Sequence, residues 1–236
     1  MAIRGVLLDL DNTLIDFMGM KRAASDAAAR AMVAAGADFP FSLAAAGDIL
    51  FGRYRDDIEG DTVFEDFLRE HHRQKLRLDQ HAVDRITAAA VNAYLVAKQT
   101  RLQPYPGVRR TLIELVRRGL RLGVITDAPR FKAYQRLDAA GLTDFFDFVL
   151  TTTDHGKIKP DPKPFLVALE RFGFTPPECL MVGDWPERDL VGGRNAGMKT
   201  AWARWGGPPE ESASVDADFH LERFQDLLKV TAFHGA

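Results

Sequence analysis

The sequence predicts an α/β protein with a doubly wound parallel sheet and a separate helical region inserted behind its first strand. A short apolar run at residues 6–8 ends in acidic residues, and residues 17–98 show helical periodicity without a convincing strand. From residue 108 onward, helical and strand-like segments alternate, which is typical of a parallel sheet covered by helices. We therefore expect a Rossmann-like core of residues 1–16 and 99–236 and an inserted four-helix domain of residues 17–98.

The inserted region is expected to hold four consecutive helices. Apolar residues recur at spacings of three and four from residue 17 onward, and Gly36 follows as a stop signal. Thr62 and Glu65 stand at the spacing of a capping box, which predicts the start of the third helix. The expected helices cover residues 17–35, about 42–60, 62–76 and 79–98.

The rest of the chain alternates between helix and strand. Pro104 and the pair Pro106-Gly107 mark a linker before this part begins. Apolar, β-favouring segments predict strands, and amphipathic segments closed by glycines predict helices. Strands are expected at residues 120–126, 146–151, 180–182 and 199–203, helices at 108–118, 130–140, 164–172 and 187–196, and a last short strand and helix within 219–230.

Composition limits the classes of function. With 236 residues, of which 46% are hydrophobic, the chain can bury a sizeable core. The formal net charge is −2 without a long basic run, so neither nucleic acid nor a membrane is an expected partner. The single cysteine, Cys179, cannot form an internal disulfide, and the N-terminus lacks the features of a signal peptide. We expect a cytoplasmic monomer or homodimer.

Polar residues follow several of the predicted strands. Asp9 and Asp11 end the first strand, and strand alternation places their side chains on the same side. Thr126 ends the second strand and Asp184 a later one. Because open parallel sheets bind ligands outside the carboxyl ends of their strands, these residues could converge in one crevice. An acidic turn that merely closes a strand is the alternative interpretation of Asp9 and Asp11.

Four short motifs, in this order, resemble those of the haloacid dehalogenase-like (HAD) hydrolase superfamily, in the subclass with a helical cap inserted after the first motif. The motif segments are Asp-Leu-Asp-Asn-Thr-Leu at residues 9–14, Thr126-Asp127, Lys159 in Lys-Pro-Asp-Pro, and Gly183-Asp184 with Asp189 five positions on. Each motif alone is a weak signal, but four in order are specific. The resemblance covers residues 3 to about 204.

The resemblance implies a Mg²⁺-dependent phosphatase that hydrolyses a small phosphomonoester through an aspartyl-phosphate intermediate. It makes Asp9 the nucleophile, Asp11 the general acid and then base, and Lys159 a fixed positive charge beside them. The implied site consists of catalytic Asp9, Asp11 and Lys159, of phosphate-binding Asn12, Thr126, Asp127 and Lys159, and of metal-binding Asp9, Asp11 (through its backbone carbonyl), Asp184 and Asp189.

More than one function and more than one role for single residues remain open. A 2-haloacid dehalogenase also uses an aspartate nucleophile but needs neither a metal nor a second acid, so Asp11 and Asp184 argue against it. The motifs are also compatible with a phosphosugar mutase and with a non-catalytic binding member of the superfamily. Lys157 lies close enough to be confused with Lys159, and Asp189 could instead be favoured by a helix dipole. Candidates for substrate contact in the cap are Lys21, Arg53 and Arg55, with a solvated helix face as the competing interpretation.

Overall fold

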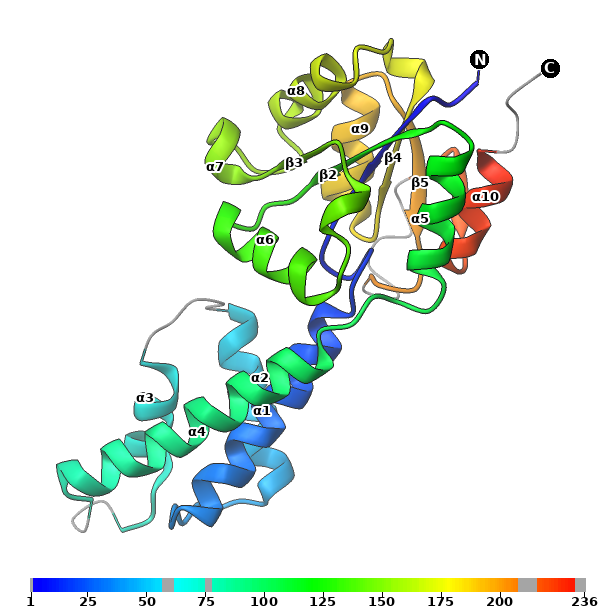
Figure 1. The fold of residues 1–236 in the computed structure, drawn as a ribbon. Coiled ribbons are helices and arrows are strands. Elements are labelled where there is room, and N and C mark those ends of the chain that lie inside the picture. Colours follow the sequence, from blue (N-terminus) through cyan, green and yellow to red (C-terminus); the bar gives the residue numbers. More distant parts are fainter. Residues whose placement is uncertain (1, 57–61, 75–77, 208–215, 232–236) are drawn as a thin grey trace. The chain divides into compact units, whose positions relative to one another are not determined.

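The computed structural model describes residues 2–56, 62–74, 78–207 and 216–231. The chain divides into two compact units (Figure 1), a core unit of Met1–Asp16 with Gln103–Ala236 and a helical unit of Phe17–Leu102. The helical unit ends beyond residue 98 because its last helix, α4 (Gln80–Arg101), continues past the expected end.

The core unit is built on a parallel sheet. Within the described residues, six strands lie in the order β3-β2-β1-β4-β5-β6, and each neighbouring pair is parallel. The order reverses at β1, which lies between β2 and β4, and this confirms the predicted doubly wound fold. The strands are β1 (Gly5–Leu8), β2 (Arg121–Ile125), β3 (Phe148–Leu150), β4 (Cys179–Gly183), β5 (Lys199–Ala203) and β6 (Phe219–Leu221).

The strand register brings three strand ends together. Leu8, the last residue of β1, lies opposite Val124 of β2 and Val182 of β4. The backbone N–H of Asp9 then donates to the carbonyl of Val182 at 2.9 Å. The residues that follow β1, β2 and β4 therefore share one edge of the sheet, which is where a ligand is expected.

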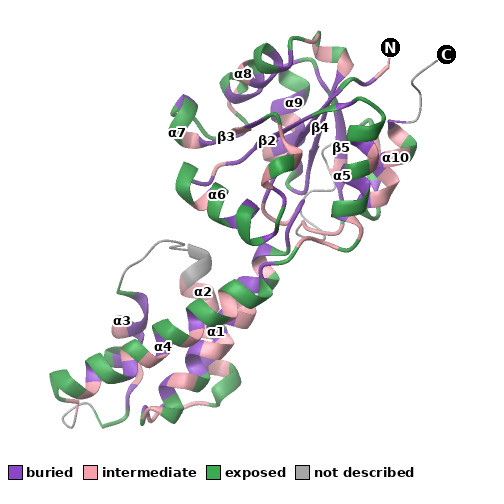
Figure 2. Ribbon diagram, in the orientation of Figure 1, coloured by how far each residue is buried: buried purple, intermediate pink, exposed green. Residues whose placement is uncertain are grey.

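Helices cover both faces of the sheet. α5 (Val108–Arg117) packs with α10 (Leu227–Val230) on one side, and α8 (Pro162–Phe172) packs with α9 (Val191–Asn195) on the other (Figure 1). Phe165 of α8 packs in a buried cluster with Leu7 of β1. Burying one such aromatic side chain contributes roughly 1.5–3 kcal/mol to stability. Figure 2 shows the central strands as the most buried part of this unit.

Two segments near the strand ends differ from the sequence-based prediction. A four-residue helix, α7 (Thr152–His155), lies between the strand predicted at 146–151 and the helix predicted at 164–172, where the sequence predicts neither, and a capping box of Thr151 and Asp154 begins it. The helix expected at 187–196 starts as a π-helical turn, Pro186–Leu190, and becomes α-helical only in α9. Such turns occur often at functional sites. One further core helix, α6 (Arg130–Ala139), lies between β2 and β3 in the chain, as expected.

The helical unit contains the four predicted helices. They are α1 (Phe17–Ala34), α2 (Leu43–Asp56), α3 (Val63–His71) and α4, and α1 packs against both α2 and α4. The predicted capping box of α3 is wrong, because the Thr62 hydroxyl bonds to Asp66 and makes no cap bond. α3 also ends earlier than expected, and residues 75–77 lie outside the described residues. None of the described helices is long and apolar enough to cross a membrane.

Candidate active site

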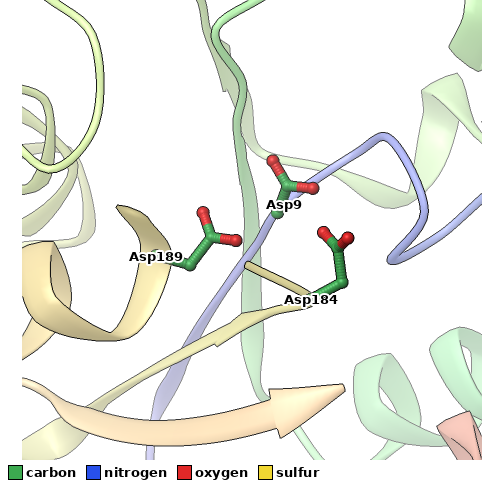
Figure 3. Close-up of side chains that lie close together, drawn as sticks. All are labelled: Asp9, Asp184 and Asp189. Atoms are coloured by element: carbon green, nitrogen blue, oxygen red, sulfur yellow. The ribbon is translucent and has the colours of Figure 1, made fainter. Parts of the chain in front are cut away.

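Three aspartates converge at the carboxyl edge of the sheet. Asp9 follows β1, Asp184 follows β4, and Asp189 lies in the π-helical turn after β4. Figure 3 shows their carboxylates facing a common space, and one oxygen from each lies within 4.8 Å of the other two. All three are buried, with exposed fractions of 6%, 5% and 1%. Carboxylate oxygens in this arrangement form the kind of site that a hard divalent cation occupies.

Local structure explains how Asp189 reaches this cluster. A Cβ atom on Gly183 would lie 2.3 Å from the Asp189 carboxyl carbon, so glycine is required at the end of β4. The backbone N–H of Trp185 donates to Asp189 at 3.1 Å. Asp189 thus lies in the first turn of the π-helical segment, where a helix dipole also favours an acid, and its carboxylate is directed into the cluster.

Lys159 joins two of the three aspartates. Its ammonium group bonds to Asp9 and, at 2.6 Å, to Asp189. The side chain is only 4% exposed and also lies 3.5 Å from the carbonyl of Ile125 at the end of β2. Lys157, by contrast, is exposed and pairs at 3.7 Å with Asp161. The structure thus distinguishes the two lysines that the sequence left close together.

The charges in the cluster perturb one another. Burial lowers the pKa of Lys159, but the negative charges of Asp189 and Asp9 outweigh this and raise it above its ordinary value. Burial raises the pKa of Asp189 to about 6, against the opposing charge of Lys159. Burial and the charges of Asp9 and Asp189 also raise the pKa of Asp184 well above its usual range. One ammonium group therefore does not offset three buried carboxylates, and a divalent cation would stabilise their ionised forms.

Asp11 lies apart from this cluster. Its carboxylate forms a salt bridge with Arg136 of α6, a residue that the motif comparison did not single out. Asn12, the next residue, has a φ of 62°, the left-handed region that asparagine tolerates better than most residues. The turn after β1 therefore sends Asp9 and Asp11 to different cationic partners.

Thr126 and Asp127 follow β2 and have different surroundings. The buried hydroxyl of Thr126 accepts a hydrogen bond from the backbone N–H of Ala128 at 3.1 Å, which leaves its own proton to donate. The Asp127 carboxylate accepts from the backbone N–H of Lys159 at 3.0 Å and pairs with Arg188. Asp127 therefore contacts the backbone that carries Lys159 and does not belong to the three-aspartate cluster.

The end of β5 and the residues that follow it support the site, a role that the sequence did not predict for them. The indole N–H of Trp202 donates to the carbonyl of Asp184 at 3.2 Å, and that of Trp205 donates to the carbonyl of Thr13 at 3.1 Å. The Thr13 hydroxyl in turn donates to the Asp184 carboxylate at 3.2 Å. A Cβ on Gly206 would lie 1.6 Å from the Asn12 carbonyl oxygen. No local pattern signals these contacts, because they join residues more than a hundred positions apart or on different strands.

The three candidates for substrate contact, Lys21, Arg53 and Arg55, belong to the helical unit. Lys21 is buried, with its ammonium 5.5 Å from the ring centroid of Phe17. Arg53 pairs with Glu70. The side chain of Arg55 lies outside the described part of the chain.

The sequence of this chain is similar to those of known proteins. A family model described as haloacid dehalogenase-like hydrolase matches residues 3–197. Glyceraldehyde 3-phosphate phosphatase of Pyrococcus furiosus is 32% identical over 231 residues, which are 97% of this chain and 92% of that protein.

Two solved structures share the fold. The HAD-hydrolase YfnB of Bacillus subtilis, in a structure bound to magnesium, gives a TM-score of 0.68 at 19% identity and covers 98% of this chain and 99% of its own. A 2-haloacid dehalogenase of Pseudomonas syringae gives 0.60 at 27% identity, with 98% of both chains covered. On the family match and the full-length similarity, this chain belongs to the haloacid dehalogenase-like hydrolases.

Proposed function

We propose that this protein is a Mg²⁺-dependent phosphatase that hydrolyses a small phosphomonoester through an aspartyl-phosphate on Asp9. The observation that carries the proposal is the buried cluster of Asp9, Asp184 and Asp189, bridged by Lys159. A phosphate ester and an aspartate nucleophile are both anions, so their approach requires positive charge at this point. The relatives named as phosphatases support the same reaction class.

The residues divide the work as follows in this proposal. Asp9 attacks phosphorus, and Lys159 holds its carboxylate and stabilises charge on the phosphoryl group. Asp9, Asp184, Asp189 and the backbone carbonyl of Asp11 would hold Mg²⁺, which supplies charge neutralisation for the phosphoryl oxygens.

The remaining motif residues act around the phosphoryl group. Thr126 donates its hydroxyl proton to a phosphoryl oxygen, and Asn12 contacts the phosphoryl group from the turn after β1. The Asp127 carboxylate holds the Lys159 backbone, so any phosphate contact of Asp127 is made by its backbone N–H. Asp11 protonates the leaving alcohol and then takes a proton from water.

The substrate is proposed to be a small phosphomonoester of the glyceraldehyde 3-phosphate class. This rests on relatives of that name that match 97% of this chain, including those of Pyrococcus furiosus and Methanopyrus kandleri. The helical unit is proposed to act as the cap domain that selects the leaving group. We propose a cytoplasmic enzyme, monomeric or homodimeric, without a nucleic-acid or membrane partner.

The dehalogenase reaction is the second candidate, because a 2-haloacid dehalogenase shares the fold at 27% identity. The test is a parallel assay of wild type with triose phosphates, other small phosphate esters and 2-chloropropionate, each with EDTA or with added Mg²⁺. We expect phosphate release that EDTA abolishes and Mg²⁺ restores, with no chloride release. Chloride release that persists in EDTA would favour the dehalogenase instead.

Asp184→Asn is the matched variant for the metal. It retains the shape of a ligand that lies in the buried cluster but removes its charge. The half-saturating Mg²⁺ concentration should rise about tenfold or more, since losing even a supporting group of a metal site costs 10–100-fold in affinity. An unchanged Mg²⁺ dependence would contradict the metal assignment.

A further inference from the structure

A buried arginine lies beside the turn that follows β1 and contains Asp11. It belongs to none of the four sequence motifs. Arg136 belongs to α6 and is only 6% exposed. Placing a guanidinium group away from water is costly unless an anion pairs with it. Its partner is Asp11, to which its Nη1 atom donates a hydrogen bond.

The backbone around Asp11 is already held by the turn. The N–H of Asn12 donates to the carbonyl of Ile15 at 2.8 Å, and the N–H of Leu14 donates to that of Leu10 at 3.0 Å. These bonds hold the backbone and do not set the direction of the Asp11 side chain. Arg136 supplies a charged contact to one carboxylate oxygen of Asp11 and so restrains that direction.

The two carboxylates of this turn therefore have separate cations. Asp9 pairs with Lys159, whereas Asp11 pairs with Arg136. Without the second cation, the Asp11 carboxylate could turn toward the positive charge of Lys159 or of a bound metal ion. An acid that ligates the metal or the lysine is no longer placed to protonate a leaving group.

We propose that Arg136 is a positioning residue for Asp11, one that directs its carboxyl group to the leaving-group oxygen and away from the cluster of Asp9, Asp184 and Asp189. The inference rests on the proposed phosphatase function. It assigns Arg136 no contact with the substrate and no proton transfer of its own.

The reaction balances with Arg136 in this role. In the first step an Asp9 oxygen bonds to phosphorus, the bond to the leaving oxygen breaks, and that oxygen takes the Asp11 proton to become an alcohol. In the second step water attacks phosphorus and passes a proton to Asp11, the bond between phosphorus and the Asp9 oxygen breaks, and its electron pair returns to the Asp9 carboxylate. Between the two steps Asp11 is a carboxylate, the form that the guanidinium group binds.

The leaving group provides the test. An alkyl phosphate needs a proton on its leaving oxygen, whereas 4-nitrophenyl phosphate needs little assistance. The kcat for glycerol phosphate and for 4-nitrophenyl phosphate is measured for wild type, Arg136→Gln and Arg136→Lys, each with and without Asp11→Asn. Arg121→Gln is the matched control, because Arg121 forms an exposed pair with Asp147 at 3.1 Å.

We expect Arg136→Gln to lower the alkyl-to-aryl ratio of kcat by about tenfold or more, since a small misplacement of a catalytic group can cost about a hundredfold. Arg136→Lys should recover part of that loss, and Arg121→Gln should retain the wild-type ratio. In the Asp11→Asn background, Arg136→Gln should change the ratio by less than about twofold, because a residue that acts through Asp11 has nothing left to position.

Three outcomes would overturn the inference. A folded Arg136→Gln variant with the wild-type ratio would leave Arg136 a packing role only. A rise in KM for both esters at an unchanged ratio would make Arg136 a phosphate-binding residue. A wild-type protein that hydrolyses neither ester would overturn the proposed function as well, which separates the two failures. Arg136→Met, which retains the apolar stem, replaces Arg136→Gln if that variant does not fold.

Discussion

The two units of this chain bury different kinds of residue. In the core unit, the carboxyl edge of the sheet buries Lys159 together with its two partners, Asp9 and Asp189, and each of these side chains is 9% exposed or less. In the helical unit, ion pairs such as Arg22 with Asp48 lie on the surface, and aromatic side chains are among the buried residues. Phe39 and Phe67, for example, contact edge to face with centroids 5.0 Å apart.

The difference shows where charge carries function. Burying a charge costs free energy of folding. A buried cluster of four charged groups, Asp9, Asp184, Asp189 and Lys159, is therefore expected only where chemistry requires it. Surface ion pairs contribute little and tolerate change. Lys21 departs from the rule in the helical unit, because it is buried there against the Phe17 ring. We therefore expect substitutions to be severe at the sheet edge and mild at the surface of the helical unit.

The largest effect is expected for Asp9→Asn, which removes the proposed nucleophile but retains its shape. Turnover should fall on the order of 10⁴–10⁶-fold, as for other enzymes that lose their nucleophile. Steady-state kinetics with 4-nitrophenyl phosphate, supported by a circular dichroism spectrum that shows an intact fold, checks this. Residual activity within about tenfold of wild type would rule out Asp9 as the nucleophile.

Lys159→Gln should have the next largest effect. It removes the cation that contacts Asp9 and Asp189, so kcat should fall by about 10²–10³-fold, the usual cost of losing one preorganised electrostatic contact. Lys157→Gln is the matched control two positions away, since Lys157 is exposed and its ammonium pairs with Asp161, outside the cluster. Equal losses of kcat in the two variants would contradict the special role of Lys159 in catalysis.

The pH dependence of stability tests the contrast between a buried histidine of the core unit, His155, and an exposed histidine of the helical unit. Burial lowers the pKa of His155, whose Nδ1 accepts a hydrogen bond from the Lys157 backbone N–H at 3.3 Å. The unfolded chain binds a proton near pH 6.5, while the folded chain binds it only at lower pH. Stability from the neutral imidazole is therefore present above the unfolded pKa and is lost as pH falls below it, by at most about 1.4 kcal/mol per pH unit for one proton.

His155→Gln should accordingly flatten the pH dependence of Tm between pH 7.5 and about 5. The control is His81→Gln, which replaces an exposed histidine of α4 and should retain the wild-type profile. Identical profiles for His155→Gln and wild type would show that His155 does not contribute to acid sensitivity.

The smallest effect is expected for Arg53→Gln in the helical unit. Arg53 pairs with Glu70, whose side chain is 58% exposed, so the free energy of unfolding should change by less than about 1 kcal/mol. Urea unfolding of both proteins measures the difference. A loss of about 3 kcal/mol, the size expected on breaking a buried ion pair, would remove the contrast between the units.

Much of the fold follows from the sequence alone. Hydrophobic periodicity is a local property, so it identified four helices in the insertion and the alternation of strands and helices after it. The motifs lie at strand ends, and the rule that ligands bind at the carboxyl ends of parallel strands brought Asp9, Thr126 and Asp184 to one edge. The ends of the helices were predicted less accurately, as the early end of α3 and the absent capping box at Thr62 show.

Only the tertiary structure decided which side chains meet. The motif already favoured Lys159 over Lys157, but only the structure shows that the Lys159 ammonium contacts both Asp9 and Asp189 and that Asp11 pairs with Arg136. The structure also placed Trp202 and Trp205 against the carbonyls of Asp184 and Thr13. These contacts join residues that are distant in the chain, and their geometry depends on how the helices and strands pack. Local patterns in a single sequence contain no information about such packing, whereas periodicity and strand-end motifs are local and can be read directly.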